Sequence, residues 1–159
     1  MSTWDSLLVT SATEKLTRDL AQIQRCAALL SAEERWWRAN RHCNSVGNLL
    51  LHLRGNVRQW IFGGFGGDAI KRARPAEFAA AQAPPGVDPL GELVATVHAA
   101  IDTIRALDAD RLLREYDIQG YRVHGLEAVF HVVEHFAAHT AQIVHITKTL
   151  RDVDLSLYD

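Results

Sequence analysis

The chain has 159 residues, of which 48% are hydrophobic and 23% are charged, and its formal net charge is −2. This composition is typical of a soluble globular protein, so we expect a single domain over residues 1–159. The lysines and arginines are scattered along a slightly acidic chain, which therefore lacks the basic surface that a phosphate backbone needs. A nucleic-acid partner is not expected.

The N-terminal segment and the cysteines indicate the compartment. MSTWDSLLVTSATEKLTRDL has no basic stretch followed by a continuous apolar run, so it does not resemble a signal peptide. No apolar run approaches the ~18 residues that are needed to cross a bilayer. The two cysteines, Cys26 and Cys43, form neither a CxxC motif nor an obvious disulfide framework. We therefore expect a cytoplasmic protein with no membrane partner.

Apolar residues recur at steps of three and four over four long segments, and this spacing predicts four long helices. The second helix begins after Asn44 or Ser45, which are good N-caps, and the glycine run 63–67 ends it. Asp88 is a candidate N-cap of the third helix, with Pro89 in its first turn. The expected helices span about residues 4–30, 45–62, 88–107 and 125–150. Their apolar faces are expected to bury Leu20, Ile23, Leu49, Leu53, Val97, Ile101, Val133 and Ala137.

Three shorter segments join these helices. Ser31–Glu34 resembles a capping box, which predicts a short helix that holds Trp36 and Trp37. The stretch 63–89 contains all four prolines, and its length favours a crossover across the end of a bundle. Residues 116–123 alternate in polarity around a glycine, which indicates an extended loop or a small hairpin. The pattern predicts an all-α, four-helix bundle with a long crossover connection.

The fourth helix carries a row of histidines. His131, His135 and His139 are spaced by four residues, so they lie above one another on one helix face together with Gln142. Aliphatic residues flank this row, and the charged edge of the helix lies elsewhere, which is unusual for a solvated face. Two histidines at such spacing can bind one divalent metal ion.

The second helix carries an uncharged polar row that resembles the wall of an interior pocket. Such rows on facing helices build metal sites in bundle cores, and three imidazoles leave one position of a tetrahedral ion open. We predict that His52 and two histidines of the fourth helix bind the ion, and spacing alone leaves open which two. Amide side chains near them are expected to orient the ligands by hydrogen bonding. The row comprises Ser45, Asn48, His52, Asn56 and Gln59, and the expected orienting residues are Asn48, Asn56, Gln59 and Gln142.

Ordinary structural explanations compete with this interpretation. Histidine pairs four residues apart also occur on solvated surfaces, and the glycine run 63–67 is explained by the end of a helix, because no Walker-type lysine follows it. The remaining histidines are assigned to the surface or to loops, and the tryptophans to the core or to an interface. These residues are His42, His98, His124 and His145, and Trp36, Trp37 and Trp60.

Two segments resemble the metal-ligand helices of the DinB-like superfamily. The segment 44–60, NSVGNLLLHLRGNVRQW, is similar to the first of them, and the segment 131–143 is similar to the closing helix, whose pattern is His-x3-His-x2-Gln-Ile. The resemblance selects His135 and His139 as ligands, with His52 completing the set and His131 as a neighbour. One departure is Ala141, where a glycine is common. The resemblance is closest to a branch without assigned function.

The resemblance also implies a cofactor and an activity. It implies one divalent metal ion, usually zinc or nickel, in a bundle that often forms homodimers. Characterised relatives include bacillithiol S-transferases and mycothiol-dependent maleylpyruvate isomerase, in which the metal activates a small thiol. We therefore predict a metal-dependent thiol S-transferase whose partners are a small-molecule thiol and a small electrophile. The alternatives are a metal-dependent hydrolase and a non-catalytic, metal- or ligand-binding dimeric bundle.

Two details of the helices bear on these alternatives. Glu134 projects about 100° away from the ligand row, and no other general base is evident, which favours thiol transfer over hydrolysis. Leu50, Val57 and Ile61 lie on the side of the second helix opposite His52. Such an apolar patch commonly marks an interface, and it predicts a homodimer.

Overall fold

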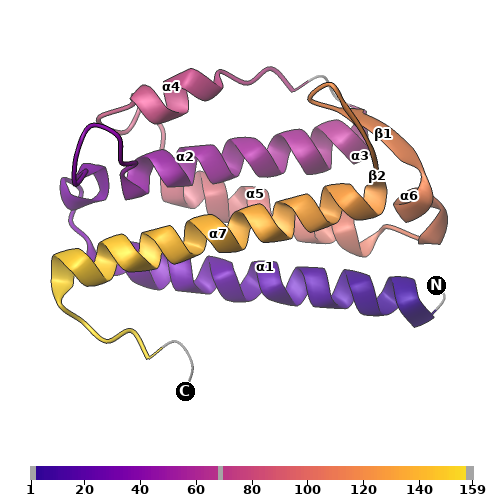
Figure 1. The fold of residues 1–159 in the computed structure, drawn as a ribbon, viewed down its shortest axis with the longest axis horizontal. Coiled ribbons are helices and arrows are strands. Elements are labelled where there is room, and N and C mark those ends of the chain that lie inside the picture. Colours follow the sequence, from indigo (N-terminus) through magenta and orange to yellow (C-terminus); the bar gives the residue numbers. More distant parts are fainter. Residues whose placement is uncertain (1–2, 68–69, 157–159) are drawn as a thin grey trace.

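The computed structural model describes residues 3–67 and 70–156, and four long helices pack side by side within these ranges (Figure 1). They are α1 (Thr3–Leu29), α2 (Val46–Val57), α5 (Pro89–Arg105) and α7 (Gly125–Arg151). Each coincides with a predicted helix to within a few residues, apart from the end of α2. The predicted all-α helical bundle is confirmed.

The four helices form a ring in which α1 and α2 occupy opposite corners. Each of these two contacts both α5 and α7. The helices α1 and α7 run in one direction, and α2 and α5 run in the other (Figure 1). Arg151, at the end of α7, accordingly donates a hydrogen bond of 2.7 Å to the carbonyl of Leu29, at the end of α1. The two helices with the polar rows, α2 and α7, are therefore neighbours.

The start of α2 is as predicted, but its end is not. Ser45 and Asn48 form a reciprocal capping box at the N-terminus. The helix does not stop at Gly63: it continues as a π-helical segment, η2 (Arg58–Gly63), and as α3 (Gly64–Gly66). A Cβ at Gly64 would collide with the Ile118 side chain, so this glycine permits close packing inside a helix. The chain turns at Gly67, where φ is +75°, a conformation that favours glycine.

The connection between α2 and α5 is a long crossover, as predicted, but its path differs from the expected one. It contains a helix that was not predicted, α4 (Arg74–Ala79), which contacts α2 along its outer side (Figure 1). A surface pocket near the start of α2 is lined by both Gly47 and Pro89, so α5 begins beside the beginning of α2. Because these neighbouring helices are parallel, the chain must return along the side of the bundle and does not cross its end.

The shorter elements close the two ends of the bundle. The capping box at Ser31 is confirmed by hydrogen bonds in both directions with Glu34, of 2.7 and 3.2 Å. The short helix that follows, η1 (Glu34–Trp36), ends before Trp37. At the other end lie α6 (Ala109–Leu113) and the predicted hairpin, in which β1 (Glu115–Ile118) pairs with the antiparallel β2 (Tyr121–His124). Asp88 precedes α5 as predicted, but its side chain caps no backbone N–H.

The core contains most of the residues that the periodicity selects. Leu20, Ile23, Leu49, Leu53, Val97 and Ile101 are buried, as predicted. Val133 and Ala137 are only half-buried, because α7 turns Val132, Phe136 and Ile143 inward instead. Around the circumference of α7, these inward residues lie between Val133 and Ala137 on one side and the histidine row on the other. The buried face of α7 was therefore predicted too far from the histidines.

The apolar side of α2 is not a surface patch. Leu50, Val57 and Ile61 are at most 1% exposed, inside the core that α2 shares with α5. The argument for a homodimer from these residues is therefore wrong. In the described part of the chain, no helix is both long and apolar enough to span a membrane.

Candidate metal centre

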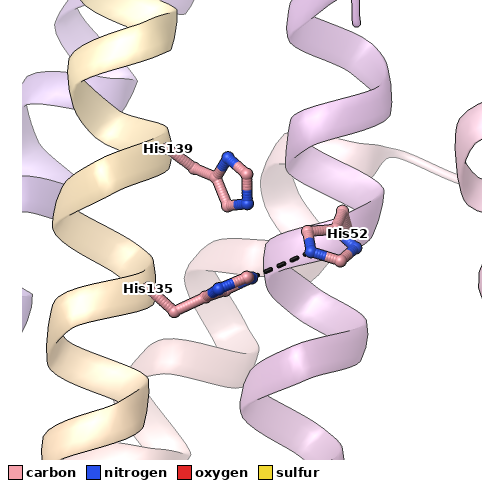
Figure 2. A group of neighbouring side chains, drawn as sticks. All are labelled: His52, His135 and His139. Carbon is pink, nitrogen blue, oxygen red and sulfur yellow. Dashed lines mark hydrogen bonds between the residues drawn. The ribbon is translucent and has the colours of Figure 1, made fainter.

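The three predicted ligands face one another between α2 and α7 (Figure 2). His52 comes from α2, and His135 and His139 come from successive turns of α7. One ligand atom from each side chain lies within 4.8 Å of the other two. The shortest approach is 2.8 Å, between Nε2 of His52 and Nε2 of His135. The fold thus gathers the histidines that the resemblance selects.

The size and chemistry of this cluster fit a divalent metal ion. Imidazole nitrogens bind zinc at 2.0–2.1 Å, so two ligands of a tetrahedral ion lie roughly 3.3 Å apart. The close pair, His52 and His135, needs to separate by about 0.5 Å to reach that spacing, which small side-chain rotations supply. Imidazole ligands suit zinc, nickel, copper and iron. The cluster therefore could hold a metal ion without rearrangement of the backbone.

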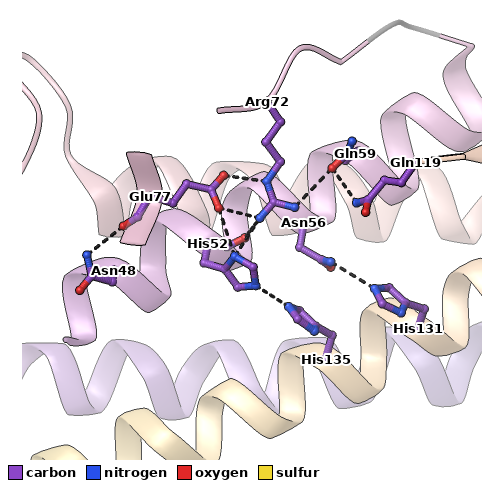
Figure 3. A network of polar contacts seen from close by, with 9 residues as sticks. All are labelled: Asn48, His52, Asn56, Gln59, Arg72, Glu77, Gln119, His131 and His135. Carbon is purple, nitrogen blue, oxygen red and sulfur yellow. Dashed lines mark hydrogen bonds and ion pairs between the residues drawn. The ribbon is translucent and has the colours of Figure 1, made fainter. Parts of the chain in front are cut away.

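A buried ion pair fixes the orientation of His52 (Figure 3). Arg72 donates from Nε to Oε1 of Glu77 at 2.6 Å and from Nη2 to Oε2 at 2.7 Å. Nη2 also lies 3.0 Å from the backbone carbonyl of His52 and 2.9 Å from its Nδ1, but it has only two hydrogens. An unprotonated Nδ1 would face the Glu77 carboxylate with its lone pair, so we assign the two hydrogens of Nη2 to Glu77 and to the carbonyl. The hydrogen between His52 and Glu77 must then come from Nδ1 of His52, which lies 3.1 Å from Oε2. The lone pair of His52 is left on Nε2, which faces His135.

Glu77 is ionised in this arrangement. Its burial favours the neutral acid, but hydrogen bonds from His52 and Arg72 outweigh that effect and lower the pKa of the carboxyl. The Arg72 side chain is 7% exposed and that of Glu77 is 13% exposed. A buried carboxylate that accepts from a histidine holds the ring in one orientation and makes the other nitrogen a better metal ligand.

Arg72 and Glu77 were missed in the sequence, although one residue gives a signal for them. Gly55 lies in the interior of α2, where glycine costs roughly 1 kcal/mol relative to alanine. A Cβ at this position would collide with Oε1 of Glu77 and with the Arg72 guanidinium. A glycine inside a helical pattern therefore marked the place where a second segment approaches the backbone.

Gln142 orients His139. Its Oε1 lies 2.8 Å from Nδ1 of His139, so Nδ1 donates the hydrogen and Nε2 keeps the lone pair. Gln142 was one of the orienting residues predicted from the sequence. His52 and His139 therefore both present Nε2 to the cluster.

Two imidazoles of the cluster, those of His135 and His139, are held in the neutral form. Burial, together with repulsion from His139 and His52, lowers the pKa of His135 to about 3. Burial also lowers the pKa of His139. A metal ligand must be unprotonated, so protons compete poorly for these nitrogens near neutral pH.

His131 lies outside the cluster. Its ring stacks on Trp60 with 3.8 Å between ring centroids, and its Nε2 lies 3.2 Å from Nδ2 of Asn56. Asn56 thus contacts a neighbour of the ligands and none of the ligands themselves. His131 extends the ring contacts along α7, with 5.4 Å between its centroid and that of His135.

Asn48 and Gln59 act on the segment that carries the ion pair. Asn48 donates from Nδ2 to the carbonyls of Glu77 and Ala80, both at 2.8 Å, and so anchors α4 to α2. Oε1 of Gln59 accepts from Nη1 of Arg72 at 3.3 Å (Figure 3). The polar row of α2 therefore supports Glu77 and Arg72, which were absent from the sequence-based prediction.

The fold and the cluster define a helical bundle with a three-histidine cluster between two adjacent helices, and known structures share this fold. A conserved protein from Enterococcus faecalis is 14% identical over 96% of this chain and 99% of its own, with a TM-score of 0.74. A DinB-like protein from Bacillus subtilis, YjoA, is 15% identical over 94% and 98%, with a TM-score of 0.72. The fold is thus DinB-like.

The sequence places the chain in a particular family. A family of proteins of unknown function, DUF1572, matches residues 5–158, and the chain belongs to it. No curated protein sequence matches the chain.

Proposed function

We propose that this protein binds one divalent metal ion, zinc or nickel, through His52, His135 and His139, and that it transfers a small thiol to a small electrophile. The observation that carries the proposal is the cluster of three imidazoles, two of which have their Nε2 lone pairs fixed by Glu77 and Gln142. When bound, the ion would lower the pKa of a thiol, whose ordinary value near 8.5 leaves little thiolate at neutral pH.

The state of the nearby carboxylates favours thiol transfer over hydrolysis. Hydrolysis needs a group that accepts a proton from water. Both oxygens of Glu77 are engaged by Arg72 and His52, and its pKa is lowered, so it is a poor proton acceptor. Glu134 is on the exposed edge of α7. In thiol transfer the sulfur loses its proton to the solvent, forms a bond to the electrophilic carbon, and the leaving group departs with its electron pair.

The test is turnover of 1-chloro-2,4-dinitrobenzene with cysteine, glutathione and bacillithiol, by zinc-loaded and metal-free protein. We expect thioether formation that requires the metal and is lost in His135→Ala and in His139→Ala. His131→Ala is the matched control, because this histidine lies on the same face of α7 but outside the cluster, and it should keep most of the activity. Metal-dependent cleavage of esters or amides with no thiol turnover would overturn the proposal in favour of a hydrolase. No turnover in either assay would favour a non-catalytic bundle.

A further inference from the structure

A surface cavity of about 560 Å³ opens beside the histidine cluster, between α7, α2 and the segment that precedes α2. It lies at the end of the bundle where η1 and the last turns of α7 meet (Figure 1). Its volume is within the range of pockets that hold small molecules. Its lining includes Trp37, Cys43, Leu49, Gln142, His145 and Ile146.

The cavity adjoins the candidate metal centre through both helices. Leu49 precedes His52 by three residues on α2, and Gln142 follows His139 by three residues on α7. Three residues advance a helix by roughly 4.5 Å, so the cavity begins one turn from the ligands. Gln142 belongs to both sites, because it lines the cavity and accepts the hydrogen bond from His139.

The lining indicates an uncharged and mainly apolar ligand. Trp37, Leu49 and Ile146 supply apolar surface, and none of the residues that line the cavity is Asp, Glu, Lys or Arg. An ionic ligand would lose hydration there without gaining a counter-charge. The Trp37 side chain is 38% exposed and offers an indole face for stacking. Imidazole, amide and hydroxyl groups at the rim can orient a neutral polar substituent.

We propose, on the basis of the proposed function, that this cavity binds the electrophilic substrate, and that this substrate is a small, uncharged molecule with an aromatic ring. The larger groove between α1 and α7 is a poorer candidate. It is lined by Glu134 and Ala137 of α7, which lie on a different side of the helix from His135 and His139.

Binding of an unreactive probe tests this proposal directly. The probe is 2,4-dinitrotoluene, which is uncharged and has no leaving group, and 2,4-dinitrobenzoate is its charged counterpart. In calorimetric titrations we expect the neutral probe to bind zinc-loaded and metal-free protein alike, and the carboxylate to bind much more weakly. Trp37→Ala should weaken binding by about tenfold, the upper range for one aromatic contact.

Trp4→Ala is the matched control, because Trp4 is 43% exposed and lines the α1–α7 groove. It should bind the probe as the wild type does. Equal affinity in wild type and Trp37→Ala, or a loss confined to Trp4→Ala, would overturn the proposal. A second variant, Ile146→Trp, fills the cavity from the α7 side and should also weaken binding.

The thiol of Cys43 provides a second readout. Cys43 is half-buried in the cavity wall, whereas Cys26 is buried in the core, where burial raises the pKa of its thiol. Ellman's reagent should therefore react first with Cys43. Saturating 2,4-dinitrotoluene should slow that reaction several-fold, and Trp37→Ala should need about tenfold more probe for the same protection. A modification rate that does not change at saturation would contradict the proposal.

These measurements separate the cavity from the proposed reaction. Probe binding without any thiol turnover would sustain the cavity and reject the transferase. Metal-dependent thiol turnover whose KM for the aromatic electrophile is unchanged in Trp37→Ala would sustain the transferase and reject the cavity as the electrophile site.

Discussion

Two hydrogen-bond acceptors, one on α4 and one on α7, determine which imidazole nitrogens face the centre of the cluster. Glu77 accepts from His52, and Gln142 accepts from His139. The carboxylate carries a full charge, whereas the amide does not, so Glu77 is expected to have the larger effect on ligand strength.

Glu77→Gln should therefore weaken zinc binding by about tenfold to hundredfold, the usual effect of losing such a hydrogen-bond partner. It keeps the shape of the side chain but leaves the buried Arg72 guanidinium without its counter-charge. Competition with a chromogenic chelator measures the affinity. Glu134→Gln is the control, since it removes a carboxylate next to His135 in the sequence but on the exposed edge of α7. An equal effect of both variants would show that net charge alone is responsible.

The low pKa of His135 predicts acid sensitivity of the metal-free protein. The folded-state pKa is about 3, whereas an unfolded chain has a histidine pKa near 6.5. Between these values the unfolded state binds a proton that the folded state does not, so the free energy of unfolding falls as the pH falls from 6.5 towards 3. Urea denaturation at pH 7 and pH 5 should show a smaller loss in His135→Gln than in the wild type. Parallel losses in the two proteins would refute this assignment.

At the scale of elements, the site depends on how closely α4 approaches α2. Asn48 bonds to two carbonyls at the end of α4, and Gly55 leaves room for the Arg72–Glu77 pair. Both residues act on the segment that carries Glu77.

Gly55→Ala tests this dependence with opposing effects. Alanine favours the helix by roughly 1 kcal/mol, but its methyl group would displace Glu77 and Arg72. We expect a clear loss of zinc affinity, measured by the same competition, while circular dichroism shows that helicity is retained. Gly91→Ala on α5 is the control, because the atoms nearest to its Cβ would belong to the Asp88 side chain and not to Arg72 or Glu77. Unchanged zinc affinity in Gly55→Ala would mean that α4 does not set the orientation of His52.

The periodic elements could be predicted from the sequence, and the aperiodic ones could not. The histidine row on α7 and the polar row on α2 are local patterns, so their spacing indicates their faces directly. The helix α4 has no buried residue, so it shows no apolar stripe, and its partner His52 lies more than twenty residues before it. Val133 and Ala137 were misassigned to the core because they line an apolar groove on the surface.

At the scale of the whole molecule, that groove is an extended apolar surface feature. It lies between α1 and α7, has a volume of about 680 Å³, and includes Trp4, Leu7 and Phe130, which are 43%, 64% and 52% exposed. Its lining contains Lys15, Arg18 and Asp19 on α1 and Glu134 on α7. A surface with both signs of charge can be self-complementary about a two-fold axis. The homodimer stays a prediction, and this face replaces the side of α2 as its expected interface.

Light scattering at micromolar concentration should therefore give the mass of a dimer. The double variant Leu7→Glu with Phe130→Glu should give that of a monomer, because two carboxylates would be buried in the interface. Leu113→Glu is the control, since Leu113 is 59% exposed on α6, outside the groove. A monomeric wild type would refute the homodimer, and a dimeric double variant would refute this interface.

The central claim is that one metal ion is bound by His52, His135 and His139, and elemental analysis of dialysed protein tests it most directly. We expect about one zinc or nickel ion per chain in the wild type and in His131→Ala, and almost none in His52→Ala, His135→Ala or His139→Ala. A wild type without metal would contradict the claim. So would metal that persists in His135→Ala and His139→Ala but is lost in His131→Ala.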